Sequence, residues 1–170
     1  MSPLIFGVTG WKNSGKTRLV AGIVRELGAR GFTVSTVKHA HHGFDVDKPG
    51  TDSFAHREAG AHEVALVSGK RWVLMHEMRG AKEPALAEIL SKLAPCDIVI
   101  IEGFKSSPHP KIEATRSATK RDQPIWPNDK TIVAIASDYD VGNSGRAEID
   151  LNDISTITDF IQDYLKMSAP

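Results

Sequence analysis

Residues 10–17 read Gly10-Trp11-Lys12-Asn13-Ser14-Gly15-Lys16-Thr17 and match the pattern G-x-x-x-x-G-K-[ST] without a gap. The apolar run at residues 4–8 is typical of a strand, whereas apolar residues at helical spacing follow from Lys16. A glycine-rich turn between strand and helix directs backbone N–H groups and the positive end of the helix dipole at one place. This context predicts a phosphate-binding loop.

The loop residues have expected roles toward a nucleoside triphosphate and Mg²⁺. Lys16 is expected to span the β- and γ-phosphates, and Thr17 to place its hydroxyl on Mg²⁺. A solvated Lys12 is as good an interpretation as a phosphate contact, because an exposed loop lysine needs no partner. The other nucleotide contacts are expected from the rest of the segment, which comprises Gly10, Trp11, Lys12, Asn13, Ser14, Gly15 and Arg18.

Strand-like and helical patterns alternate along the rest of the chain. Further strands are expected at residues 32–37, 97–101, 111–115 and 132–136, and helices at 53–59, 84–93 and 154–165. Two strand-like runs flank Ser68-Gly69-Lys70 and predict a hairpin at about residues 62–77. The pattern predicts one α/β domain over residues 1–170, P-loop NTPase-like, with a mostly parallel sheet, helices on both faces and an added β-hairpin.

Glu102 ends the most apolar run of the chain. Ligands of open α/β sheets sit beyond the carboxyl ends of the strands, where both this residue and the phosphate loop are expected. We therefore expect Glu102 to hold Mg²⁺ directly or through water, or to orient an attacking water, and Gly103 to bring an N–H toward the γ-phosphate. The plainer interpretation is that Glu102 is only the first solvated residue after a strand.

A polar loop with three histidines, His39, His41 and His42, follows the second strand. One hypothesis is a switch-like loop in which Asp45 or Asp47 assists Mg²⁺ and Lys38 or the histidines meet an anionic group. A transition-metal site is the alternative, although the spacing matches no structural zinc pattern. A merely solvated loop is the third interpretation.

Composition narrows the class of protein. The chain has 170 residues, 41% of them apolar, and equal numbers of acidic and basic residues, 21 of each. This balance gives no reason to expect nucleic acid or a membrane as partner. With one cysteine, Cys96, no intrachain disulfide can form. No basic leader or membrane span is visible, so a cytoplasmic protein is expected.

The histidine and aspartate string resembles the MobB family, molybdopterin-guanine dinucleotide biosynthesis protein B, from about residue 4 to about residue 138. Carrying it are Lys38, His39, His41, His42, Phe44, Asp45, Asp47, Pro49, Gly50, Asp52, Ser53, His56 and the run 59–61, with the phosphate loop and residues 101–105. The resemblance implies a GTP-binding protein with weak Mg²⁺-dependent GTPase activity. It also implies a homodimer that assists the molybdenum cofactor guanylyltransferase, with molybdopterin as a possible ligand.

Guanine recognition and dimer formation have candidate residues. Ser137 and Asp138 follow a predicted strand, and the carboxylate can face guanine N–H groups as the aspartate of N-K-x-D does in familiar GTPases. The Asn and Lys of that element are missing, so the expected preference for GTP over ATP depends on the resemblance. The hairpin around Gly69 is the candidate dimer contact. Two other function classes stay open, a small-molecule kinase and a metal carrier using the histidine loop.

Overall fold

The computed structural model describes residues 3–40, 43–119 and 123–168. The chain divides into two compact units, Met1–His39 with Leu90–Pro170, and Ala40–Ile89. The expected single domain over residues 1–170 therefore remains a prediction.

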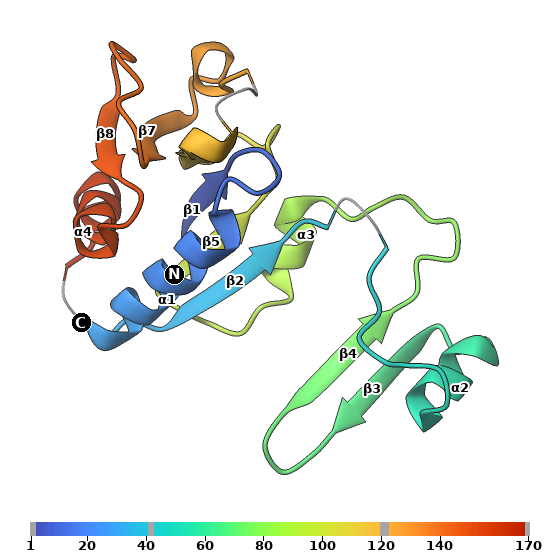
Figure 1. Ribbon diagram of the computed structural model, residues 1–170. Helices are drawn as coiled ribbons and strands as arrows, with labels where there is room; N and C mark the ends of the chain where they lie inside the picture. The colour runs from blue at the N-terminus through green and yellow to red at the C-terminus, as the bar shows by residue number, and fades with distance from the viewer. Residues whose placement is uncertain (1–2, 41–42, 120–122, 169–170) are drawn as a thin grey trace. The chain divides into compact units, whose positions relative to one another are not determined.

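The first unit is built on a parallel sheet of six strands in the order β2-β5-β1-β6-β7-β8 (Figure 1). The phosphate-loop strand β1 lies inside the sheet, with β5 on one side and β6 on the other. The carboxyl ends of these three strands therefore meet at one edge. The strands are β1 (Leu4–Thr9), β2 (Val34–Lys38), β5 (Ile98–Glu102), β6 (Lys111–Thr115), β7 (Ile132–Ser137) and β8 (Ala147–Asp150).

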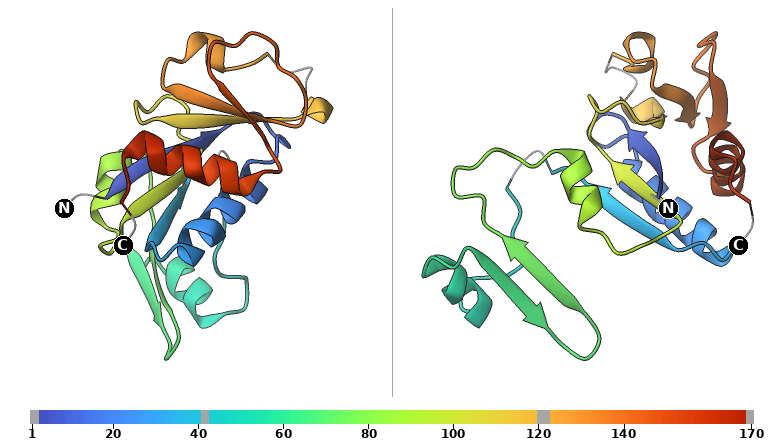
Figure 2. Two further views of the ribbon diagram at one scale, coloured as in Figure 1. Left: turned by 90° about the vertical axis from the view of Figure 1, so that its left-hand side faces the viewer. Right: turned by 180° about the vertical axis from the view of Figure 1, so that it is seen from behind.

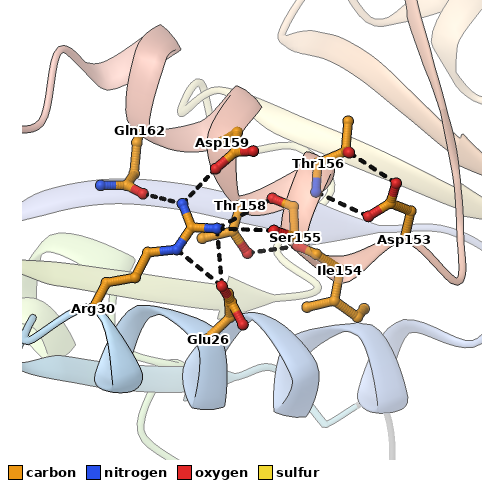
Figure 3. A network of polar contacts seen from close by, with 9 residues as sticks. All are labelled: Glu26, Arg30, Asp153, Ile154, Ser155, Thr156, Thr158, Asp159 and Gln162. Atoms are coloured by element: carbon orange, nitrogen blue, oxygen red, sulfur yellow. Dashed lines mark hydrogen bonds and ion pairs between the residues drawn. The ribbon is translucent and has the colours of Figure 1, made fainter.

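Helices α1 (Lys16–Ala29) and α4 (Ile154–Leu165) pack side by side on one face of this sheet (Figure 2). Their apolar stripes bury against the strands in one core. Arg30, just after α1, joins the helices by bonding Glu26 at 2.9 Å, Asp159 at 2.5 Å and Gln162 (Figure 3). Asp153 caps α4 by accepting the Thr156 N–H.

Strand β6 is buried on both faces, but one face is polar. Lys111, Glu113 and Thr115 alternate with apolar residues that enter the core, and Lys111 and Glu113 are 0% and 1% exposed. The Glu113 carboxylate accepts N–H groups of Ile125 and Trp126 at 3.1 and 2.8 Å. The chain at Ile125 and the 3₁₀ turn Trp126–Asn128 are thus anchored to this face through the Glu113 carboxylate.

The second unit holds α2 (Asp52–Glu58) and an antiparallel hairpin of β3 (Glu63–Val67) and β4 (Trp72–His76). A short helix, α3 (Leu86–Ser91), lies at the boundary in sequence between the units. Thr51 caps α2 by accepting the Phe54 N–H, and Asp52 is the first residue of the helix. No helix in the described part of the chain is long and apolar enough to span a bilayer.

The predicted fold class is confirmed: a mostly parallel sheet with helices and an added hairpin. Strand β8 was not expected from sequence. It is short and largely exposed at the sheet edge, so its residues carry little of the apolar pattern by which a buried strand is recognised.

Candidate nucleotide-binding site

The loop between β1 and α1 has the backbone shape of a phosphate cradle. Gly10, Asn13 and Gly15 all have positive φ, at 141°, 65° and 93°. A Cβ on Gly10 would lie 2.3 Å from the Ala114 carbonyl oxygen, so only glycine fits there. These left-handed residues turn the chain sharply before α1 begins at Lys16.

Lys16 extends back over this loop. Its Nζ donates to the Trp11 carbonyl oxygen at 2.5 Å. Burial lowers its pKa, the Glu102 charge opposes that effect, and the charges of Lys105 and Lys38 lower the pKa further. Several ammonium groups therefore lie around the loop of a chain with no net charge, and this is the local field that a polyphosphate would neutralise.

Thr17 and Glu102 meet at the start of α1. The Thr17 Oγ1 donates to Glu102 Oε1 at 2.9 Å, and the Lys38 Nζ lies 3.3 Å from the same carboxylate oxygen. Pairing of Val8 with Glu102 in adjacent parallel strands brings the carboxylate to this position. The sequence predicted that the two residues share a magnesium site, and the structure brings them into contact.

Two buried hydroxyls, one at the end of β1 and one in the loop, support a fit to nucleotide and metal. Among the described residues, the buried Thr9 Oγ1 and Ser14 Oγ have no hydrogen-bond partner. Buried polar atoms are normally satisfied, so these two oxygens point to an interaction made with a ligand. Oxygen ligands such as the Thr17 hydroxyl and the Glu102 carboxylate are those that Mg²⁺ prefers.

The other predicted loop residues are placed less specifically. Lys12, Asn13 and Arg18 are exposed around the loop. The Gly103 N–H donates to the Val8 carbonyl oxygen at 3.1 Å, so in this conformation it is not directed at a phosphate. The Trp11 side chain is partly exposed, and its indole N–H donates to the Gln123 carbonyl oxygen at 2.6 Å.

Ser137 is the last residue of β7, and Asp138 follows it at the same edge of the sheet. The Asp138 carboxylate accepts the Ser117 N–H at 2.6 Å, which ties it to the loop after β6. The Ser137 hydroxyl is engaged with the backbone of Tyr139, 2.8 Å from its carbonyl oxygen. Their role in guanine recognition stays a prediction.

Asp45 and Asp47 belong to the second unit and pair with Arg57. The Arg57 guanidinium lies 3.1 Å from Asp45 and 2.8 Å from the buried Asp47. Their proposed assistance to Mg²⁺ stays a prediction. His41 and His42 lie outside the described residues, and within them no group of three His, Cys, Asp or Glu side chains could hold a metal.

Arg116 is a candidate residue of the nucleotide site that the sequence analysis missed. It follows the last residue of β6, and its Nε lies 3.3 Å from the position of a Cβ on Gly15. This nitrogen is buried and has no partner among the described residues. No motif marks Arg116, but its place at the carboxyl end of a strand beside β1 was a signal that could have identified it.

Comparison with known proteins decides the family. Residues 5–138 match the profile of MobB, described as "Molybdopterin guanine dinucleotide synthesis protein B". The chain belongs to the MobB family. Among MobB relatives, a "Molybdopterin-guanine dinucleotide biosynthesis adapter protein" of Haemophilus influenzae is 37% identical over 95% of this chain and 89% of its own length. One of the same name from Escherichia coli is 34% identical over 98% and 95%.

Solved MobB structures share the fold. The crystal structure of Bacillus subtilis MobB aligns with a TM-score of 0.76 at 22% identity, covering 97% of this chain and 99% of that one. A MobB homologue from Bacillus stearothermophilus aligns with a TM-score of 0.73 at 23% identity, over 96% and 99%. At these identities the likeness supports the fold alone.

Proposed function

We propose that this chain binds GTP with Mg²⁺ and acts as an adapter in molybdopterin-guanine dinucleotide biosynthesis, with slow hydrolysis of the nucleotide. The observation that carries the proposal is the contact between Thr17 and Glu102 beside a glycine-shaped loop. Lys16 and the N–H groups at the start of α1 would bind the phosphates, while Thr17 and Glu102 would hold the metal. Bound Mg²⁺ supplies neutralisation of the β- and γ-phosphate charge.

The choice of guanine rests on the family and on Asp138. This carboxylate lies after β7, and its bond from the Ser117 N–H leaves acceptor capacity for the N–H groups of a guanine edge. Calorimetric titration with GTP, ATP and GDP, each with and without Mg²⁺, tests the proposal. We expect GTP to bind more tightly than ATP and more tightly with Mg²⁺ than without. Equal affinities for GTP and ATP, unaffected by Mg²⁺, would contradict it.

The adapter role includes a homodimer formed through the β3–β4 hairpin. Val67, Trp72 and Leu74 share one face of this hairpin, and Val67 and Trp72 are 80% and 71% exposed. Apolar faces of this kind on a protein surface commonly mark an interface. The guanylyltransferase that the adapter would assist, and a molybdopterin ligand, complete the proposal and rest on the names of the relatives.

A further inference from the structure

Lys105, three residues after Glu102, is a partly buried lysine that rests on an aromatic ring. Its ammonium is 4.0 Å from the centre of the Trp11 indole ring, and no carboxylate pairs with it among the described residues. Lysine is rarely buried without an ion pair, and a cation–π contact at a partly exposed site is weak. The Lys105 ammonium therefore keeps hydrogen-bond donors for an anionic ligand.

Trp11, on which Lys105 rests, belongs to the phosphate loop and is held at three points. Its carbonyl oxygen accepts from Lys16 Nζ at 2.5 Å, its indole N–H donates to the Gln123 carbonyl oxygen at 2.6 Å, and its ring contacts the Lys105 ammonium. Two lysines are thus engaged by one residue in the free protein. A phosphate would offer both a charged acceptor, which is a stronger partner than a carbonyl oxygen or a ring face.

The surrounding charges place Lys105 near one end of a nucleoside triphosphate. After burial, which lowers the pKa of Lys16, and the Glu102 charge, which raises it, the Lys105 charge lowers that pKa, so the two ammonium groups are within electrostatic reach. Lys16 is expected to span the β- and γ-phosphates, and a metal at Thr17 and Glu102 would bridge oxygens of the same two groups. Lys105 therefore lies on the side of the terminal phosphates.

The backbone that carries Lys105 is strained. Gly103 and Phe104 have positive φ, at 93° and 49°, and a bulky side chain seldom adopts such a φ. The turn is packed against the end of β2, because the ring centres of Phe104 and His39 are 4.7 Å apart and the His39 N–H donates to the Glu102 carbonyl oxygen at 2.9 Å. Strained turns held by their surroundings cluster at ligand clamps and switch segments.

We propose that Lys105 is the residue that distinguishes a nucleoside triphosphate from a diphosphate. In the free protein its ammonium rests on the Trp11 ring, and it moves to the terminal phosphate when a triphosphate binds. A diphosphate leaves Lys105 on the ring, because the group that would draw it away is absent. The inference rests on the proposed function for the identity of the ligand, and it adds the side chain by which two nucleotide states are told apart.

The test measures the affinity of the full-length chain for GTP and for GDP by calorimetry, with Mg²⁺ present. Lys105→Ala should weaken GTP binding about tenfold or more and GDP binding less than about threefold, since only GTP loses a charge-assisted contact. Lys105→Arg keeps the charge and should stay within about threefold of wild type for both nucleotides. Lys130→Ala changes an exposed lysine and should bind both as wild type does. An unchanged unfolding midpoint shows that each variant is folded.

A double-mutant cycle tests the exchange between ring and phosphate. Trp11→Leu removes the ring on which Lys105 rests, so the free ammonium has less to give up when GTP binds. The effect of Trp11→Leu on GTP affinity should therefore be more favourable, by about threefold or more, when Lys105 is present than in the Lys105→Ala background. Independent effects of the two changes would contradict a contact that is exchanged on binding.

Failure of this inference is distinguishable from failure of the proposed function. If Lys16→Ala loses both nucleotides while Lys105→Ala binds GTP and GDP as wild type does, the nucleotide site stands and the role of Lys105 is overturned. Equal weakening of GTP and GDP by Lys105→Ala also overturns it, because the cation would then serve both nucleotides alike. A wild-type chain that binds neither nucleotide overturns both proposals.

Discussion

At the scale of residues, charge balance explains how the candidate metal site is arranged. The Glu102 carboxylate contacts the Thr17 hydroxyl at 2.9 Å and the Lys38 ammonium at 3.3 Å. The Lys38 Nζ also lies 3.5 Å from Thr17 Oγ1, so a cationic group touches both predicted magnesium ligands. The carboxylate is therefore paired in the free protein, and a metal would compete with this ammonium for it.

Glu102→Gln should remove the effect of Mg²⁺ on GTP affinity. The amide keeps the size of the side chain and a bond from Thr17 but loses the charge that a divalent cation needs. Thr17→Ser, which keeps a hydroxyl, is the control and should bind GTP with Mg²⁺ within a few-fold of wild type. Affinity measured at several Mg²⁺ concentrations checks this, and a Glu102→Gln protein that still responds to Mg²⁺ would show that the metal is held elsewhere.

Gly10→Ala should destabilise the fold by about 2 kcal/mol or more, because the position has φ 141° and no room for a Cβ. Gly28→Ala is the matched control. Gly28 lies in helix α1 with nothing near its Cβ position, so alanine there should stabilise the protein by about 0.5–1 kcal/mol. Urea unfolding of both variants measures the two free energies, and equal effects would contradict the strained loop.

His109 should make stability depend on pH. It is buried against Gly7, and burial, with the Lys111 charge, lowers its pKa to about 4 although Asp129 opposes this. The pKa of His109 in the folded protein lies below the ordinary 6.5. Between these two values the unfolded chain therefore binds a proton that the folded chain does not bind. The contribution of His109 to the free energy of unfolding is complete above pH 6.5. It is lost as the pH falls toward 4, by about 3 kcal/mol at most.

His109→Phe keeps a ring of similar size without the titration. Its free energy of unfolding should fall less than that of wild type between pH 6.5 and 4. His56→Gln changes an exposed histidine and should follow the wild-type curve. Parallel slopes for wild type and His109→Phe would show that His109 titrates normally.

At the scale of elements, the sequence predicts those strands and helices whose positions are set by a pattern of apolar residues. Strands β1, β5, β6 and β7 and helices α1 and α4 lie within a few residues of their predicted positions. Strand β8 was missed because an exposed edge strand lacks that pattern. The polar face of β6 was also missed, since Lys111 pairs with Asp129 and Glu113 accepts from Ile125, both of which come from the chain after β6.

The exposed apolar face of the β3–β4 hairpin gives a prediction about the homodimer. Val67→Glu places a charge on this apolar face, so it should convert a dimer to monomer. Ala55→Glu adds the same charge to an exposed position of α2 and should leave the dimer intact. Sedimentation equilibrium measures the mass of each. A wild-type monomer, or a dimer that survives Val67→Glu, would contradict an interface on this face.

At the scale of the whole molecule, the candidate functions fall in different units of the chain. The phosphate loop and Glu102 belong to the first unit, whereas the hairpin and the Arg57 ion pairs belong to the second. Relatives from Haemophilus influenzae and Escherichia coli match this chain over nearly its full length, so both units are part of what the family shares. A predicted nucleotide site in one unit and a candidate association surface in the other suit an adapter.

The measurement that bears most directly on this account is equilibrium binding of GTP, with Mg²⁺ present, to wild type and to Lys16→Ala. Affinity should fall at least about tenfold while the unfolding midpoint stays unchanged, since the ammonium faces the loop and not the core. Lys130→Ala, an exposed lysine before β7, should bind as wild type does. Equal GTP affinity in Lys16→Ala and wild type would contradict a phosphate site at this loop.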